Sequence, residues 1–288
     1  MARVTLDALP GVPALLARAA APSLRRPDPD HAVLDRTVLV HGYRSEPERL
    51  AAYARVCGFT LRDALPATWL HVLTFPLQAW IMSRSDFPFA LPGMVHLSND
   101  MTLHRGVGGR EPLTLEAGAM NLRPHTRGAT VDLVGRALVD GELVWEGTSV
   151  YLAPGTSMPG EPVLGLRLDV PHVEPSQLWR LPADLGRQYA RVSGDINPIH
   201  LSPLTARAFG QKRTIIHGMW THARALAALE GRLPDSFRAE VQFTKPLSLP
   251  GSARFGASES DGGTGFVVTN PDASKPYLIG RLGWDAGR

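Results

Sequence analysis

The sequence contains one cysteine, Cys57, so it cannot form an internal disulfide. This absence excludes a disulfide-stabilised secreted fold and favours a reducing compartment. No segment approaches the roughly 18 apolar residues that a membrane-spanning helix needs. The start of the chain is the one candidate for a targeting signal, but Pro10, Pro13 and Arg18 interrupt its apolar residues. We therefore expect a cytoplasmic protein with no membrane span, whose first residues form a short helix or cap.

The sequence also lacks a clear excess of positive or negative charge. The chain has 30 Lys and Arg against 27 Asp and Glu, a net charge of +3, and no run of five like charges. A nucleic-acid-binding protein typically carries a basic stripe or cluster, so we expect no nucleic-acid partner. The 288 residues, 44% of them hydrophobic, are enough to build two ordinary domains with cores of their own.

Two short motifs occur twice in the same order. YARV lies at residues 53–56 and again at 189–192, while TWLH at 68–71 resembles TIIH at 214–217. Each YARV ends a segment that opens with proline and acidic residues, as a short helix often does. Two ordered matches in the same context indicate two unequal copies of one unit. The second copy carries about ten extra residues between its two landmarks.

Each copy continues with one apolar helix. After His217 the apolar residues recur every three or four positions to near Gly231, which predicts a helix with one buried face. In the first copy, residues 69–82 are apolar nearly all round, so we expect a fully buried helix with Pro76 in its first turns or at a kink.

Strand-like segments separated by turn signals follow each helix. An apolar helix followed by an antiparallel meander, twice over, predicts the α+β class, with each sheet wrapped around one helix. We divide the chain into an N-terminal extension (1–30), a first domain (31–153), a Pro/Gly-rich linker (154–164) and a second domain (165–288). The expected strands lie at 94–104, 112–123, 129–140 and 142–153, and at 237–249, 252–260, 265–270 and 277–285.

The segment YARVSGDINPIH places Asp195 and His200 five residues apart among turn-forming residues. We expect both on a tight loop outside any helix, with Asn197 and Pro198 fixing the bend so that the two side chains point the same way. A carboxylate and an imidazole held in this way could share one water molecule and exchange protons with it.

His217, Gly218 and Met219 open the helix of the second copy. A glycine there exposes a backbone N–H at the positive end of the helix dipole, where a developing oxyanion is stabilised. We interpret His217 as a structural hydrogen-bonding residue. Its spacing from His222 puts the two rings on different helix faces, so no metal site is expected.

The segment YARVSGDINPIHLSPLTARAFGQKRTIIHGM resembles the signature of the MaoC-like (R)-specific enoyl-CoA hydratases, also called the hydratase 2 family, and FTKPLSLPG resembles the strand and turn that follow it. The resemblance implies a double hot-dog fold, in which one chain imitates a dimer of single subunits. It also implies reversible syn addition of water to trans-2-enoyl thioesters, giving (R)-3-hydroxyacyl thioesters in fatty-acid metabolism. The carrier of the acyl group would be coenzyme A or acyl carrier protein, and no metal or redox cofactor would be needed.

On this resemblance, Asp195 and His200 activate water and the amide of Gly218 binds the thioester oxygen. The first copy has Phe59, Ala64 and Val72 at the corresponding positions. We therefore expect one active site per chain, with the first copy lending walls to the acyl pocket. The ten residues that the first copy lacks would leave room for a longer or bulkier acyl chain.

Supporting roles fall to neighbours of these residues. Ser193 and Asn197 belong to the turn, and Met219 and Thr221 belong to the start of the helix. The family often has a hydroxyl residue early in this helix, and either Thr221 or Ala223 is its counterpart here.

Two other functions stay open, a hot-dog thioesterase and a non-catalytic acyl-binding subunit. A thioesterase would place a carboxylate on or beside the helix, and residues 216–229 contain none. A homodimer of the whole chain is also left open.

Overall fold

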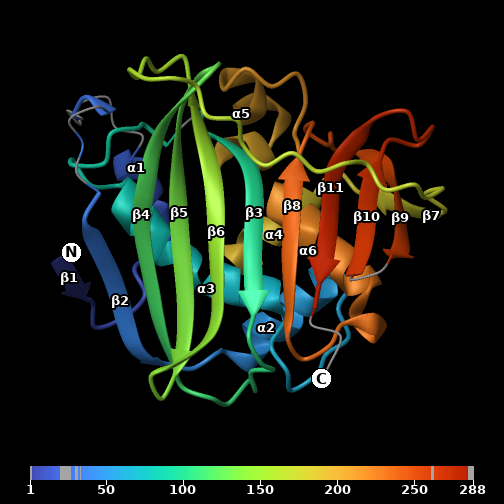
Figure 1. Ribbon diagram of the computed structural model, residues 1–288, viewed down its shortest axis with the longest axis horizontal. Coiled ribbons are helices and arrows are strands. Elements are labelled where there is room, and N and C mark those ends of the chain that lie inside the picture. Colours follow the sequence, from blue (N-terminus) through green and yellow to red (C-terminus); the bar gives the residue numbers. More distant parts are fainter. Residues whose placement is uncertain are drawn as a thin grey trace.

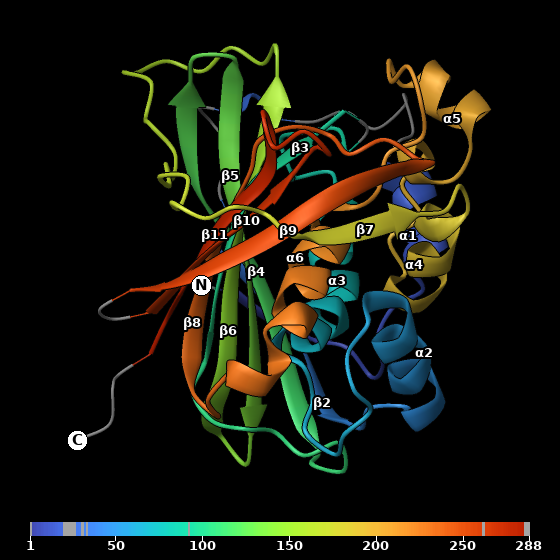
Figure 2. The ribbon, with the colours of Figure 1, turned by 90° about the vertical axis from the view of Figure 1, so that its right-hand side faces the viewer.

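The structure is a computed structural model, and it describes residues 2–19, 27–29, 32, 34–91, 93–260 and 263–284. Within these residues eleven strands form one sheet, in the order β1-β2-β4-β5-β6-β3-β8-β11-β10-β9-β7 (Figure 1). The helices lie on one face of this sheet (Figure 2). The strands are β1 (Ala2–Thr5), β2 (Arg36–Tyr43), β3 (Val95–Leu103), β4 (Leu113–His125), β5 (Gly128–Val139), β6 (Glu142–Pro154), β7 (Gln177–Leu181), β8 (Phe237–Phe243), β9 (Gly251–Ser260), β10 (Gly263–Thr269) and β11 (Pro276–Gly283).

Two similar halves meet in the middle of the sheet. Strands β2 to β6 curve around helix α3, and strands β7 to β11 curve around helix α6 (Figures 1 and 2). The halves join where β3 pairs antiparallel with β8, from Ser98↔Gln242 to Leu103↔Phe237. One continuous sheet built from two helix-wrapping halves confirms the double hot-dog prediction. The helices are α1 (Val12–Ala19), α2 (Pro47–Cys57), α3 (Ala67–Met82), α4 (Leu185–Ser193), α5 (Pro203–Ala208) and α6 (Gly218–Ala228).

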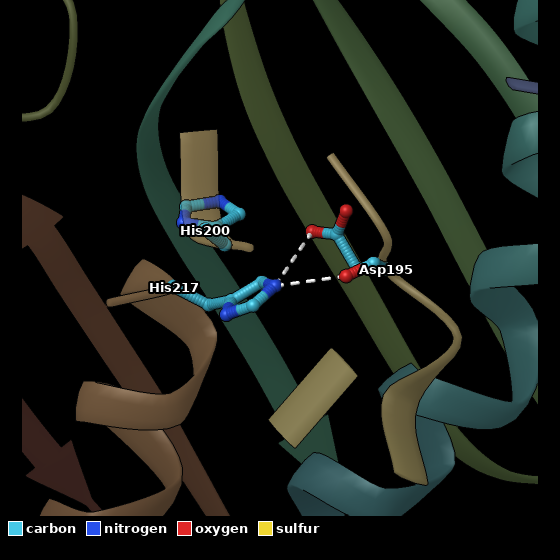
Figure 3. Close-up of side chains that lie close together, drawn as sticks. All are labelled: Asp195, His200 and His217. Carbon is cyan, nitrogen blue, oxygen red and sulfur yellow. Dashed lines mark hydrogen bonds and ion pairs between the residues drawn. The ribbon is translucent and has the colours of Figure 1, made fainter. Parts of the chain in front are cut away.

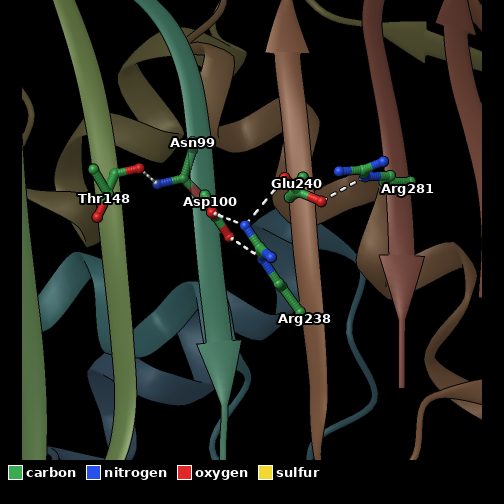
Figure 4. A network of polar contacts seen from close by, with 6 residues as sticks. All are labelled: Asn99, Asp100, Thr148, Arg238, Glu240 and Arg281. Carbon is green, nitrogen blue, oxygen red and sulfur yellow. Dashed lines mark hydrogen bonds and ion pairs between the residues drawn. The ribbon is translucent and has the colours of Figure 1, made fainter. Parts of the chain in front are cut away.

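Charged side chains cross the junction of β3 and β8. Arg238 on β8 donates to both carboxylate oxygens of Asp100 on β3, at 2.9 and 2.6 Å, and to Glu240 at 3.2 Å (Figure 4). Glu240 in turn accepts a hydrogen bond from Arg281 on β11 at 2.5 Å. The network adds charge-assisted hydrogen bonds to the backbone ladder and ties three strands from both halves together.

Helix α3 is the buried helix that the sequence predicts, because every residue in it except Trp80 is buried. Of the two alternatives expected for Pro76, a place in the first turns is wrong, because the helix already begins at Ala67. Instead Pro76 sits in the middle, where its missing N–H leaves the carbonyl of Val72 without its usual helical partner. None of the helices in the described ranges is long and apolar enough to span a membrane.

The repeat predicted from the two YARV motifs corresponds to helices α2 and α4. Both end at a glycine in the left-handed conformation, Gly58 at φ 83° and Gly194 at φ 80°. Side chains cross between the halves here, since Arg49 of α2 donates to the carbonyl of Val192 at 2.9 Å and Trp220 of α6 donates to that of Val56 at 2.9 Å. The ten extra residues of the second copy lie between His200 and Thr214, in the segment that holds helix α5 and the chain that follows it.

Several elements differ from the sequence-based expectation. Strands β1, β2 and β7 were not predicted; β7 is a five-residue edge strand, too short for a clear alternating pattern. The strand expected at 237–249 ends at Phe243, because Pro246 and Pro250 cannot donate to a ladder. The expected N-terminal helix is present as α1, preceded by β1, which pairs parallel with β2. Residues 20–26 of the predicted extension, and Asp285 at the end of the last predicted strand, lie outside the described residues.

The segment 155–176, which contains most of the predicted linker, has no regular secondary structure and crosses the face of the sheet opposite the helices (Figures 1 and 2). The backbone N–H of Leu168 donates to the side chain of Gln242 on β8 at 3.0 Å. A Cβ on Gly256 would lie 2.9 Å from the backbone of Pro175. A glycine at this position therefore lets the crossing chain lie close against β9.

Packing of the sheet against helix α3 can be tested by substituting Gly135 on β5. A Cβ at this position would lie 2.5 Å from Oγ1 of Thr74 on α3, so Gly135→Val should push the helix away and destabilise the protein by roughly 1–3 kcal/mol. Gly118 on the neighbouring strand β4 is the control, since a Cβ there meets only the carbonyl of Arg36 at 3.7 Å. Urea unfolding should show Gly118→Ala within about 1 kcal/mol of wild type. Equal losses for both variants would contradict this packing.

Candidate active site

A pocket of about 430 Å³ opens between the two halves. Its wall from the first half comes from helix α3, the start of β3, Arg127, and Tyr151 of β6. Its wall from the second half comes from α4, α6, parts of the chain between them and the loop 244–247. All eight site residues predicted from the sequence line this pocket. They are Ser193, Asp195, Asn197, His200, His217, Gly218, Met219 and Thr221.

Asp195 follows the end of helix α4 on a turn that its neighbours hold in place. The hydroxyl of Ser193 accepts from the backbone N–H of Asp195 at 3.2 Å, and Asp195 Oδ1 accepts from that of Asn197 at 3.1 Å. Asn197 Oδ1 then accepts from the N–H of Ile199 at 3.4 Å. These bonds hold Oδ1 of Asp195 within the turn. The side chain of Asp195 is 30% exposed, so its other carboxylate oxygen, Oδ2, remains available to the pocket.

His200 ends the 3₁₀ helix Pro198–His200, so the prediction that it lies outside any helix is wrong, and its side chain is buried. Its Nδ1 is 2.8 Å from the carbonyl oxygen of Ile215, so Nδ1 carries the proton and Nε2 keeps its lone pair. Burial lowers the pKa of His200, and the negative charge of Asp195 opposes this only in part. The ring is therefore neutral near pH 7 and ready to accept a proton at Nε2.

His217 joins the turn to helix α6. Its Nε2 donates to the backbone carbonyl of Asp195 at 2.9 Å and lies 3.9 Å from the Asp195 carboxylate, while its ring stacks on His200 with centroids 3.7 Å apart (Figure 3). Burial, and then the neighbouring His200, lower its pKa well below the ordinary range. These contacts agree with the structural role that the sequence suggests for His217.

Asp195, His200 and His217 also form a group whose side-chain nitrogen and oxygen atoms lie within 4.8 Å of one another. Such a spacing can suit a metal ion. Here, however, the His217 Nε2 proton and the His200 Nδ1 proton both point at carbonyls, and His217 Nδ1 is buried without a partner among the described residues. Each histidine thus has one ring nitrogen engaged with a carbonyl, and the spacing of up to 4.8 Å among the three side chains leaves room for a water molecule that both Asp195 and His200 could contact.

Gly218 is the first residue of α6, where a backbone N–H has no partner within the helix. A Cβ at this position would lie 2.9 Å from the ring of Phe243 on β8, so glycine lets the aromatic ring close against the helix start. Of Thr221 and Ala223, the two alternatives considered from the sequence, Thr221 lines the pocket and Ala223 does not. Its hydroxyl donates to the carbonyl of His217 at 3.4 Å.

The first half contributes polar groups that sequence reasoning did not assign to the site. His71, His96 and Tyr151 line the pocket, and the rings of His96 and Tyr151 stack with centroids 4.4 Å apart. Burial and the charge of Asp195 raise the pKa of Tyr151, which places its hydroxyl in the field of the carboxylate. The sequence gives no signal for His96 and Tyr151, because β3 and β6 both contain several other polar residues.

The first-copy counterparts of the site residues take other places. Phe59 stacks on Tyr53 at 6.2 Å, and Ala64 forms an isolated bridge with Gly108. Val72 lines the same pocket as Gly218. Arg224 on α6 lies over the ring of Trp179 at 5.3 Å and close to Gly58 of the first half, where an added Cβ would meet its guanidinium, and Cys57 is fully buried.

Comparison with known proteins gives a family model and close relatives. The model described as "MaoC like domain" matches residues 171–270. The sequence is 36% identical over 264 residues to 3-hydroxyacyl-thioester dehydratase X of Mycobacterium tuberculosis, covering 91% of this chain and 94% of that protein. The crystal structure of that protein, HtdX, matches with a TM-score of 0.77 and 34% identity, covering 86% of this chain and all of that one.

Two more distant structures show the same fold. A MaoC-like dehydratase from Phytophthora capsici matches with a TM-score of 0.72 at 18% identity, over 89% of this chain and 96% of that one. A second Mycobacterium tuberculosis protein, described as having a double hot-dog fold, matches with a TM-score of 0.58 at 15% identity, over 89% and 97% of the two chains.

The buried histidines predict acid sensitivity. Burial lowers the pKa of His71 from 6.5 to about 4 and that of His222 from 6.5 to about 3. Between these values and 6.5 the unfolded chain binds protons that the folded protein does not, so stability is complete above about pH 6.5 and falls as the pH is lowered. The urea midpoint should be lower at about pH 5 than at about pH 7.5.

His222→Leu should weaken this pH dependence, because neither ring nitrogen of His222 has a hydrogen-bond partner among the described residues. His104→Leu is the matched control, since that histidine is 39% exposed and near Glu146. An unchanged difference between the two urea midpoints in His222→Leu would show that His222 is not a source of the acid sensitivity.

Proposed function

Because the chain belongs to the MaoC-like dehydratase family, we propose that it catalyses the reversible syn hydration of trans-2-enoyl thioesters to (R)-3-hydroxyacyl thioesters. One observation carries the proposal. Asp195, the free Nε2 of His200 and the start of helix α6 at Gly218 face one pocket. The pocket thus joins a proton-transferring pair to a backbone N–H suited to a thioester oxygen.

The thioester carbonyl is bound at the start of α6. There the N–H of Gly218 has no partner within the helix, and the helix dipole favours negative charge. As water adds to C3, negative charge moves from the C2–C3 double bond to the carbonyl oxygen, giving an enolate-like state. The Gly218 N–H stabilises that charge, and protonation at C2 restores the thioester.

Asp195 and His200 hold the reacting water. The water oxygen bonds to C3, one of its protons passes to the pair, and one proton passes from the pair to C2, so that one molecule of water is added in total. Both groups reach the substrate from the same side, as syn addition requires. Because every step is a proton transfer or an addition of water, the proposed chemistry needs no metal or redox cofactor.

His217 and the first half have supporting roles in this scheme. His217 holds the backbone of Asp195 and stacks on His200, so it orients both members of the pair. Val72 and Phe75 of α3 supply apolar wall on the first-half side of the pocket, suited to an acyl chain. Hydrolysis of the thioester is not favoured, since α6, with the sequence GMWTHARALAA, carries no carboxylate.

The first activity test replaces the proton-transferring pair. Asp195→Asn and His200→Ala should each reduce kcat by roughly 10²–10⁴-fold, because each removes an acid–base group. The measurement is loss of the conjugated thioester absorbance with trans-2-enoyl-CoA of several chain lengths. His104→Ala, outside the pocket, should retain activity. A variant within about threefold of wild type would remove that residue from the catalytic pair, since threefold is under about 0.7 kcal/mol of barrier.

A second test compares equivalent positions in the two halves. Gly218→Ala brings a methyl group against Phe243 and disturbs the donor to the thioester oxygen, so kcat should fall by roughly 10²–10³-fold. Val72→Ala should keep kcat but lower stability by roughly 1–2 kcal/mol, because Val72 is 2% exposed. If Val72→Ala, still folded, lost as much turnover as Gly218→Ala, the division of roles between the halves would be wrong.

A further inference from the structure

The entrance of the pocket carries unpaired positive charge. Among the lining residues, Arg127 of the β4–β5 turn and Lys245 of the loop after β8 are exposed, so the two halves each place one cation at the entrance. Neither makes an ion pair within the part of the chain that the structure describes. Arg238, Arg105 and Arg281, in contrast, all bind carboxylates. The charge at the entrance is therefore available to a ligand.

Residues 203–213, here called the overhang, extend this surface beside the entrance. They comprise α5 and the chain after it, which lie at the top of the molecule in Figures 1 and 2. Arg207 and Lys212 are exposed and also lack an ion pair among the described residues. The whole stretch from Ile196 to His217 contains no acidic residue, so nothing within it offsets these charges.

The overhang also exposes apolar side chains. Leu204 is 80% exposed and Phe209, which lines the pocket entrance, is 42% exposed. The backbone beneath them is held firmly, because the hydroxyl of Thr205 donates to the carbonyl of Pro198 at 2.7 Å and Arg213 donates to that of Pro250 at 2.6 Å. A fixed surface that combines exposed leucine and phenylalanine with unpaired cations suits a protein partner with acidic and apolar side chains.

We propose that the overhang, together with Arg127 and Lys245, docks an acidic acyl carrier protein that delivers the enoyl or hydroxyacyl group on its phosphopantetheine arm. The proposal rests on the function proposed above and names the carrier. Coenzyme A would supply phosphates for Arg127 and Lys245, but it has no protein surface to cover Leu204. The first half lacks a counterpart of the overhang, so this surface accompanies only the half that carries Asp195 and His200.

The test compares one acyl group on two carriers. Trans-2-decenoyl groups are attached to a recombinant bacterial acyl carrier protein and to coenzyme A, and kcat/KM is measured for both. Wild type should prefer the carrier-protein thioester. That preference should fall as salt is raised from about 50 to about 300 mM, because exposed charges are screened.

Three variants then separate docking from chemistry. Arg207→Glu and Leu204→Asp should each lower kcat/KM for the carrier-protein thioester roughly fivefold or more, chiefly through KM, and leave the coenzyme A thioester within about twofold. Arg55→Glu, an exposed charge on α2 at the other end of the helical layer, should change neither (Figure 2). Circular dichroism establishes that each variant is folded.

The possible results distinguish failure of the docking proposal from failure of the proposed function. Equal use of both carriers by wild type, or equal effects of Arg207→Glu and Arg55→Glu on the carrier-protein thioester, would overturn the docking surface while leaving the hydratase intact. Failure of wild type to hydrate either thioester would instead overturn the proposed function itself.

Discussion

The antiparallel pairing of β3 with β8 is the constraint on which the rest of the structure depends. It joins two helix-wrapping sheets into one, and the charged residues Asp100, Arg238 and Glu240 reinforce it on the sheet. Because the sheet is continuous across this seam, α3 and α6 lie on the same face, and the pocket forms where the two halves meet. Neither half encloses the pocket alone, since each supplies part of its wall.

The two halves share their packing elements but differ in the residues that they place at the pocket. Both retain the short helix ending in a left-handed glycine and a central buried helix, which are requirements of packing. Only the second retains the turn that holds Asp195 and the segment that carries His200 and α5. In the proposed mechanism the reacting groups come from the second half only, and the first-half counterpart of Gly218 is Val72, which lines the same pocket.

The enclosed position of the site governs its electrostatics. Burial lowers the pKa values of His200 and His217, so both rings are neutral near pH 7, and hydrogen bonds to two backbone carbonyls decide which nitrogen carries the proton. The same burial applies to His71 and His222 outside the reacting pair. Neutral histidines at neutral pH suit the proton transfer proposed for the site, and the same burial predicts that acid destabilises the core.

The repeat, the α+β class and eight of the residues that line the second-half side of the pocket could be predicted from the sequence, because these are encoded in local turn chemistry and in a contiguous motif. The family resemblance added the hot-dog topology, and the fully buried α3 followed from its all-round apolar pattern. The tertiary structure alone decided which strands form the edges, that the strand after α6 stops before Pro246, and that Pro76 lies in mid-helix. It alone also brought His71, His96 and Tyr151 to the pocket, since these residues, 124, 99 and 44 positions before Asp195, become its neighbours only when β3 and β8 pair.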